Sequence, residues 1–300
     1  MDYFLELLCS GLTRGSIYAL IALGYTMVYG IIQLINFAHG EIYMIGAFVA
    51  LIVSGVLTIY GFSGFSILVL AGLIAMIYAA AYGYTLEKIA YQPLRNAPRL
   101  SPLISAIGAS LFLQNYVLLA QTPDFLPFPE LIPEFAFMEP VAHIMGSSEL
   151  VILVTSAISM VVLTLLIKYT RIGKAMRATQ QDMVMARLVG INVDRVISVT
   201  FIIGSVLAAI GGVLVGSYIG QINFYIGFMA GVKAFTAAVL GGIGNIPGAA
   251  LGGLVLGLAE SMAAGYISSA YEDVFAFGVL VLILILRPAG LLGKAVKQKV

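Results

Sequence analysis

The stretch Lys168 to Arg195, KYTRIGKAMRATQQDMVMARLVGINVDR, is a long polar interruption in a chain that is otherwise largely apolar. It contains Lys168, Arg171, Lys174, Arg177, Arg187 and Arg195, against two acids, Asp182 and Asp194. Short loops with such an excess of Lys and Arg stay on the cytoplasmic side of a membrane. The stretch therefore predicts a cytoplasmic loop, residues 168–195, and sets the orientation of the neighbouring spans.

A short helix is predicted inside this loop. Asp182 can accept hydrogen bonds from the first free amides of a helix, and Gly190 can take the left-handed conformation just past its last turn. The helix would run from Met183 to Val189, and Asn192 or Asp194 would cap the next apolar helix. A helix held in this way between two spans is a docking element, although an ordinary loop whose charges only set the topology fits the residues equally well.

The composition indicates a membrane protein. Hydrophobic residues are 61% of the 300, charged residues are 10%, and the mean hydropathy is +1.06, whereas about a quarter of the residues in a soluble domain are charged. We expect an all-α polytopic membrane protein of about eight or nine transmembrane helices, some of them broken or re-entrant, folded as a single domain over residues 1–300. The single cysteine, Cys9, excludes an internal disulfide.

Apolar runs of about 20 residues, enough to cross a bilayer, supply these spans. They are residues 12–35, 42–60, 65–86, 102–121, 150–167, 196–219, 249–267 and a last run that ends at Leu286, and residues 229–240 allow only a partial crossing. All fifteen Lys and Arg residues except Arg14 and Lys233 fall in residues 87–99, 168–195 and 287–300, which are therefore predicted to be cytoplasmic, the C-terminus included. Residues 122–149 contain acids but no Lys or Arg and are the predicted outer loop. The side of the N-terminus stays open, because His39 and Glu41 fit either a cytoplasmic turn or a break at mid-membrane.

Two polar breaks lie in apolar surroundings, one at Asn36 to Glu41 and the other at Gly241 to Gly248. Irregular backbone at membrane depth is tolerated only where protein or a water-filled cavity satisfies it, and paired breaks in a transporter indicate its pathway. Simple interfacial turns are the alternative. The candidate pathway residues are Asn36, His39, Glu41, Asn223, Gly242 and Asn245.

Four ionisable residues, His39, Glu41, Lys233 and Glu260, lie within or beside predicted spans. Ion-coupled carriers keep such groups inside the membrane. Because each is near a break or a helix end, we expect snorkelling or interface placement.

Glycines also recur at four-residue spacing, at Gly212, Gly216 and Gly220 and at Gly253 and Gly257. This spacing predicts helix faces that pack closely, within this chain or against a second membrane subunit.

No catalytic, metal or cofactor site is predicted. The string from Gly290 to Ala295 lacks the first glycine of a phosphate-binding loop, and an alanine stands where the magnesium-binding hydroxyl belongs. Neither His, Glu and Cys clusters with metal-ligand spacing nor a Ser/His/Asp set can be nominated. We therefore expect a protein that is not an enzyme.

Four blocks in order resemble one family: ALIALGYTMVYGIIQLINFAHGEIYMIGAF (19–48), ISAIGASLFLQNY (104–116), RIGKAMRATQQDMVMARLVGINVDRVI (171–197) and YIGFMAGVKAFTAAVLGGIGNIPGAALGGLVLGLAE (225–260). They look like the LivH-type permease subunit of bacterial branched-chain amino acid ABC importers. The resemblance implies an inner-membrane permease that pairs with a second, related permease, two cytoplasmic ATP-binding subunits and a periplasmic amino-acid-binding protein.

The resemblance also implies a cytoplasmic coupling helix, which in ABC permeases generally carries an Ala and, four residues later, a Gly, and Ala186 and Gly190 match that pattern. The acid often found near the start of that motif is absent, because Val184 and Met185 precede Ala186. The residues implied to contact the ATPase are Asp182, Met183, Ala186, Arg187, Leu188 and Gly190.

Three alternatives remain. An ABC permease for amides or urea-like solutes would share these blocks, and an ion-coupled secondary amino acid carrier would depend on Glu41 or Glu260. A scaffold or membrane-embedded enzyme ranks last, because no catalytic set is present.

Overall fold

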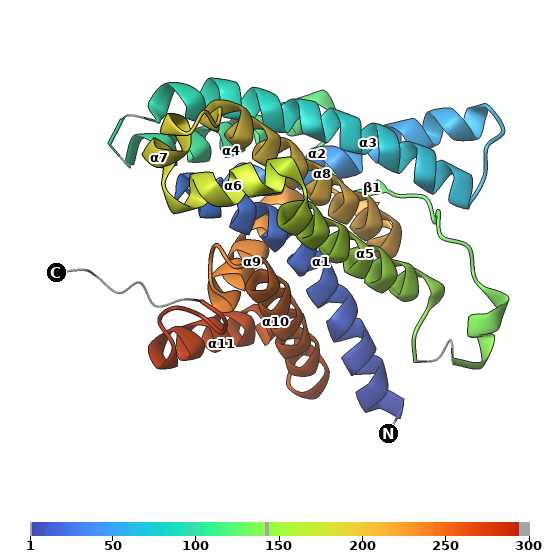
Figure 1. Ribbon diagram of the computed structural model, residues 1–300. Coiled ribbons are helices and arrows are strands. Elements are labelled where there is room, and N and C mark those ends of the chain that lie inside the picture. Colours follow the sequence, from blue (N-terminus) through green and yellow to red (C-terminus); the bar gives the residue numbers. More distant parts are fainter. Residues whose placement is uncertain (1, 96, 99, 142–143, 294–300) are drawn as a thin grey trace.

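The computed structural model describes residues 2–95, 97–98, 100–141 and 144–293 (Figure 1). The predicted cytoplasmic positions Arg99, Lys294, Lys297 and Lys299 lie outside the described residues. The described part of the chain is built from helices and one two-stranded sheet.

Eight helices in the described residues are long and apolar enough to cross a membrane, which confirms the predicted all-α polytopic fold. They are α1 (Asp2–Ile32), α2 (His39–Ile59), α3 (Phe65–Leu86) with its continuation to Leu94, α4 (Leu100–Ala120), α5 (Ser147–Tyr169), α8 (Val193–Ile219), α10 (Ile246–Tyr266) and α11 (Glu272–Leu286) with the 3-10 turn Ser269–Tyr271 before it. The apolar helix α9 (Ile226–Gly241) has 16 residues and is shorter, as expected for a partial crossing.

The segment after α3 differs from the expected loop. The chain continues as a π-helical turn (Glu87–Tyr91) and a 3-10 turn (Gln92–Leu94). Its charges do not mark a free loop, because Glu87 is completely buried and paired with Arg95. The sequence pattern suggested that these charges face water, whereas in the fold Arg95 pairs with the Glu87 carboxylate.

The polar loop 168–195 also contains a helix that the sequence analysis missed, α6 (Arg171–Gln181), followed by α7 (Met183–Leu188). Thr170 caps α6, since its Oγ1 accepts a hydrogen bond from the Gly173 amide at 3.0 Å. The buried residues Gly173, Met176 and Thr179 recur every three positions, so one stripe of α6 packs on the spans while its cations stay outside.

The predicted outer loop is held by a small antiparallel sheet in which β1 (Leu126–Pro127) pairs with β2 (Gln221–Ile222). The Phe128 amide donates to the Gly220 carbonyl at 2.8 Å, and the Phe128 ring packs against Gly216. Gly220 ends α8 with a φ of +74°, a left-handed conformation that glycine adopts without a steric penalty.

The core surrounds α1 and α8, which are largely buried between the other helices. On α1, Gly11 and Gly15 lie against α10, and a Cβ on Gly257 would stand 2.2 Å from the Gly15 nitrogen. A Cβ on Gly212 would stand 2.3 Å from the Tyr43 carbonyl oxygen. Gly212 and Gly216 of α8 and Gly253 and Gly257 of α10 therefore pack within this chain, whereas a Cβ on Gly220 would meet nothing within 4 Å.

The structure also resolves the direction of the first helix. Gly30, near the end of α1, approaches Gln180 of α6 and Gly244 of the second break, so α1 ends beside α6. The N-terminus lies at the opposite end of the molecule from α7 (Figure 1). The N-terminus and the α6–α7 segment therefore lie at opposite ends of the bundle.

Candidate functional site

The short helix α7 is capped as the sequence predicts. Asp182 Oδ1 accepts hydrogen bonds from the Val184 and Met185 amides at 2.8 and 3.0 Å. Gly190 has a φ of +85°, and the amide that follows it, of Ile191, donates to the Ala186 carbonyl at 2.9 Å. The helix ends at Leu188, one residue earlier than predicted. Both ends of α7 are thus fixed by bonds that do not depend on a partner.

The outward face of α7 is apolar. Ala186 is 3% exposed and faces the spans, whereas Leu188 is 75% exposed. Val184, Met185 and Val189 are also exposed, and Arg187 lies near Asp194 with a distance of 4.0 Å between the charged atoms. Apolar side chains exposed on a capped helix within a strongly basic segment form a surface suited to a protein partner.

A cluster of charges joins the start of α8 to the continuation of α3. Arg95 pairs with both Glu87 and Asp194, and the Ser198 hydroxyl donates to Glu87 Oε2 at 2.8 Å. Asn192, rather than Asp194, caps α8, because its Oδ1 accepts from the Arg195 amide at 3.0 Å. Asp194 is therefore free to bind Arg95. Sequence reasoning missed this cluster, because Glu87 and Asp194 are separated by more than a hundred residues.

The first break turns back into the protein between α1 and α2. Asn36 Oδ1 accepts a hydrogen bond from the Tyr91 hydroxyl at 3.0 Å, and Glu41 Oε1 accepts from Ser110 on α4 at 3.0 Å. The His39 ring packs edge-on against Tyr25, with 4.9 Å between the ring centroids.

The expectation that these charges snorkel is wrong for His39, Glu41 and Glu260. Each side chain is at most 1% exposed. His39 and Glu41 are buried because α2 begins inside the bundle, with its first turn against α1, α8 and α9. Glu260 of α10 is buried between helices, where Tyr18 of α1 and Lys233 of α9 contact it.

The second break lies between α9 and α10. Gly242 and Gly244 have φ values of +104° and +89°, which only glycine adopts readily. Asn245 Oδ1 caps α10 through the Gly248 amide at 3.5 Å, and Asn245 Nδ2 donates to the Leu292 carbonyl at 2.7 Å. The Asn245 amide group therefore stabilises the break itself.

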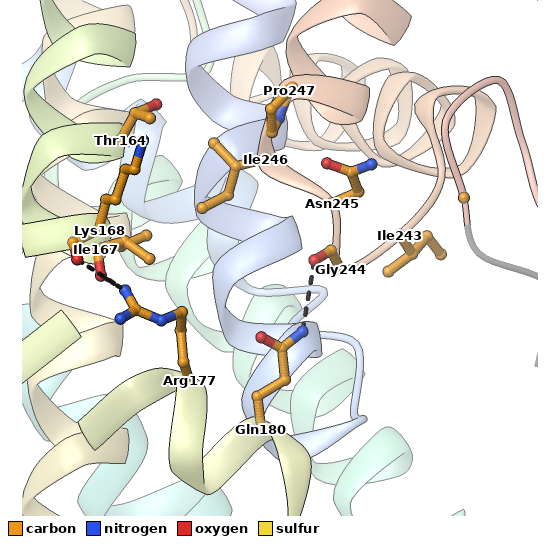
Figure 2. A pocket seen from close by; sticks show the side chains of 11 residues that line it. Thr164, Ile167, Lys168, Arg177, Gln180, Ile243, Gly244, Asn245, Ile246 and Pro247 are labelled. Carbon is orange, nitrogen blue, oxygen red and sulfur yellow. Dashed lines mark hydrogen bonds between the residues drawn. The ribbon is translucent and has the colours of Figure 1, made fainter. Parts of the chain in front are cut away.

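The remaining pathway candidate, Asn223, stands apart from Asn245. Its Oδ1 accepts a hydrogen bond from the Tyr225 amide at 3.0 Å in the turn before α9. At the other end of α9, the Gln180 side chain points from α6 toward the Gly244 carbonyl, with an N–O distance of 3.5 Å (Figure 2). The structure therefore brings the second break and the end of α1 together beside α6, while Asn223 belongs to the turn between β2 and α9.

A cavity of about 550 Å³ opens beside the second break (Figure 2). The end of α5, the second half of α6 and residues 243–247 line it. Arg177 points back toward α5 and donates to the carbonyls of Ile167 and Lys168. The cavity thus lies where the polar segment 168–195, a span and the break meet.

Arg14 and Lys233, the two cations outside the predicted cytoplasmic segments, occur in one cluster at the other end of the molecule. Lys233 Nζ lies 3.2 Å from Glu260 and 2.7 Å from Asp273, and Arg14 lies 3.0 Å from Glu272. The sequence held a signal for this cluster, since these two cations are the exceptions to the charge pattern. No group of three or more His, Cys, Asp or Glu side chains suited to a metal is found in the described residues.

The comparisons with known proteins agree with this architecture. Residues 7–284 match the family model described as branched-chain amino acid transport system, permease component. The chain is 50% identical to the high-affinity branched-chain amino acid transport system permease proteins LivH of Salmonella typhimurium and LivH of Escherichia coli K12, and also to BraD of Pseudomonas aeruginosa. Each of these alignments covers 99% of this chain and 98% of the relative.

The predicted resemblance is confirmed by this match over nearly the whole chain. The relatives are transport permease components, and the eight apolar helices agree with a multi-pass membrane protein. The chain therefore belongs to the family of permease components of branched-chain amino acid transport systems.

Proposed function

We propose that this chain is the membrane-spanning permease subunit of a binding-protein-dependent ABC importer for branched-chain amino acids in a bacterial inner membrane. The 50% identity to permeases named for branched-chain amino acid transport supports the substrate class. The complex would contain a second, related permease, two cytoplasmic ATP-binding subunits and a periplasmic amino-acid-binding protein. ATP is hydrolysed on the separate ATPase subunits, and this chain acts as the gate.

The observation that carries the proposal is α7, a capped helix with an exposed apolar face inside the basic segment. We propose that residues 168–195 form the cytoplasmic coupling loop and that α7 docks on an ATPase subunit. Within α7, Leu188 and the neighbouring Met185 and Val184 supply apolar contact area. Arg187 supplies a charge at the rim of the same face.

The bonds around α7 suggest how movement passes to the spans. Asp182 is both the last residue bonded to α6 and the cap of α7, and the charge cluster of Glu87, Arg95 and Asp194 ties the start of α8 to α3. A displacement of α7 by the ATPases would therefore shift α6 and α8 together. The α6 helix reaches the second break through Gln180, so this shift would act on the inner cavity.

The same elements support an orientation in the membrane. The described C-terminal residues lie beside the second break, since the Leu291 and Leu292 amides donate to the Leu240 and Gly241 carbonyls, and Gly293 lines the same cavity as Gln180 of α6. We propose that this end is cytoplasmic, with the C-terminus, and that residues 122–149 form the outer loop. The chain would then be one permease domain, and the two breaks, with Asn36, His39, Glu41, Asn223, Gly242 and Asn245, would border the pathway.

The proposal is tested with Leu188→Asp in the complete importer. A charge on the apolar face of α7 should cost about 1.4 kcal/mol or more of binding free energy. This loss corresponds to an affinity for the ATPase subunits that is weaker by about tenfold or more. Uptake of leucine should fall accordingly. The measurements are ATPase affinity for the purified permease pair and leucine uptake into proteoliposomes.

Leu188→Met is the matched control and should retain both activities, since it keeps an apolar side chain of similar size. If Leu188→Asp left ATPase affinity and uptake unchanged, the docking role of α7 would be refuted. Leucine uptake that continues without ATP and collapses with an ionophore would instead identify an ion-coupled carrier.

A further inference from the structure

The charge cluster at the outer end of the bundle joins four helices. Arg14 comes from α1 and Lys233 from α9, while Glu260 comes from α10 and Glu272 and Asp273 from the first turn of α11. The Tyr18 hydroxyl donates to Glu260 Oε2 at 2.7 Å, and Lys233 Nζ lies 3.9 Å from Glu272. Every acid in this cluster therefore has a cation within 4 Å.

The cluster borders a cavity of about 350 Å³. Arg14, Lys233 and Glu272 supply its charged groups, Tyr18, Tyr43 and Tyr218 add hydroxyls, and the apolar wall includes Ile17, Ile226 and Met229. The last turn of α8 also lines the cavity, so it lies at the end of the molecule opposite α7. Ligand sites in proteins are cavities of this kind, mostly apolar with a few placed polar groups.

The two cations play different parts. Lys233 is 12% exposed and pairs with Glu260, which is completely buried, so this pair is fixed inside the bundle. Arg14 and Glu272 are 38% and 27% exposed, and both line the cavity. Ionised groups in a membrane span are costly and mark substrate pathways when they face a cavity. A ligand in the cavity can therefore reach the Arg14–Glu272 pair and replace it.

We propose that this cavity receives the amino acid in its zwitterionic form at the outer end of the permease, an inference that rests on the proposed function. The α-carboxylate pairs with Arg14 and the α-ammonium with Glu272, replacing the ion pair between these two side chains. The apolar side chain of the amino acid lies against Ile17, Ile226 and Met229. Neutral amides and urea lack the two charges and do not replace the pair.

The test uses the complete importer with Ala230→Cys in a Cys9→Ser background. Ala230 lines the cavity on α9, so a membrane-impermeant maleimide should label the new thiol from the outside. At a free leucine concentration of about ten times the Kd for this cavity, roughly one site in ten is unoccupied. Labelling should therefore be about tenfold slower than without leucine. Urea and acetamide should not slow it.

Phe228→Cys is the matched control, since Phe228 lies on the same helix and does not line this cavity. Its labelling should not respond to leucine. Adding Arg14→Gln, or separately Glu272→Gln, to Ala230→Cys should abolish the protection by leucine.

Three outcomes would overturn the inference: no labelling of Ala230→Cys, no protection by leucine, or equal protection by acetamide. The same importer, with its binding protein and ATP, is assayed in parallel for leucine uptake. Leucine uptake without protection of Ala230→Cys refutes binding of the amino acid in this cavity but leaves the proposed permease function intact. Absence of uptake by the unmodified importer refutes the proposed function instead.

Discussion

Asp182 shows how one side chain separates two helices. Its backbone amide donates to the Ala178 carbonyl at 3.1 Å and so ends α6, while its carboxylate accepts from the first amides of α7. The Asp182 backbone is extended, with φ −159° and ψ 112°, so the helix direction changes there. A negative charge is also favourable at the N-terminus of a helix.

We predict that Asp182→Ala loosens α7. Loss of an N-cap costs about 1 kcal/mol of helix stability, which corresponds to an increase of about fivefold in the open population. Amide hydrogen exchange of residues 183–188, measured in the purified permease pair, should quicken by about this factor. Exchange in α8 should change little, since Asn192 caps that helix independently.

Asp182→Asn is the control, because asparagine caps helices about as well as aspartate. Exchange in α7 of this variant should stay close to that of the unaltered chain. Equal exchange in the alanine variant and the unaltered chain would show that Asp182 does not hold α7.

At the scale of the helices, the packing of α1 against α10 depends on glycines, which have no side chain. Gly11 and Gly15 of α1 lie against Leu258 and Leu254 of α10, and Gly253 lies against Ala19. Lipid tails are as apolar as leucine, so helices in a bilayer gain stability from close van der Waals contact rather than from leaving water. The missing Cβ atoms make that contact possible.

We predict that Gly257→Leu separates α1 from α10. A Cβ on Gly257 would stand 2.2 and 2.4 Å from backbone atoms of Gly15, and backbone cannot move aside as a side chain does. Such overpacking costs about 1–3 kcal/mol or more. The thermal transition of the purified permease pair should fall by several degrees, or the folded yield should drop.

Gly72→Leu on α3 provides the comparison, because a Cβ on Gly72 would meet nothing within 4 Å. This variant should unfold close to the temperature of the unaltered chain. If both variants lowered the transition equally, leucine itself and not the contact between α1 and α10 would be responsible.

At the scale of the whole molecule, the two ends of the bundle differ in charge and in construction. One end has the basic segment with α6 and α7, and the cavity beside the second break. The other has the N-terminus, the two-stranded sheet and the cluster around Arg14 and Lys233. An alternating-access mechanism requires a cavity toward each side of the membrane, and the proposed function assigns one cavity to each end.

We predict that Tyr3→Cys is labelled from outside intact cells and that Lys174→Cys is labelled only after the cells are made permeable. Tyr3 is 52% exposed at the N-terminal end of α1, and Lys174 is exposed on α6. The two variants are made in a Cys9→Ser background and treated with a membrane-impermeant maleimide. The Cys9→Ser chain without a new cysteine shows the background labelling.

Labelling of Lys174→Cys in intact cells would reverse the orientation and remove α7 from any cytoplasmic partner. Labelling of both Tyr3→Cys and Lys174→Cys only after permeabilisation would instead place both ends of α1 on one side, in conflict with the course of α1 through the bundle.

The sequence by itself determined the class of protein, most of the spans and both caps of α7. These features depend on local chemistry: runs of apolar residues, the uneven distribution of Lys and Arg, and the side-chain oxygen and glycine that end a helix. Asp182 and Gly190 therefore had the predicted roles. The helix α6 was missed because its buried stripe is short and its many charges resemble a loop.

Only the tertiary structure decided where the charged side chains lie. Burial of His39 and Glu41 follows from the start of α2 within the bundle, and the pairing of Glu87 with Arg95 and Asp194 joins segments far apart in sequence. The outer cluster likewise needs α1, α9, α10 and α11 to meet. A charge inside a span is stable only beside its partner, and which partner it meets depends on helix packing that no local pattern of residues encodes.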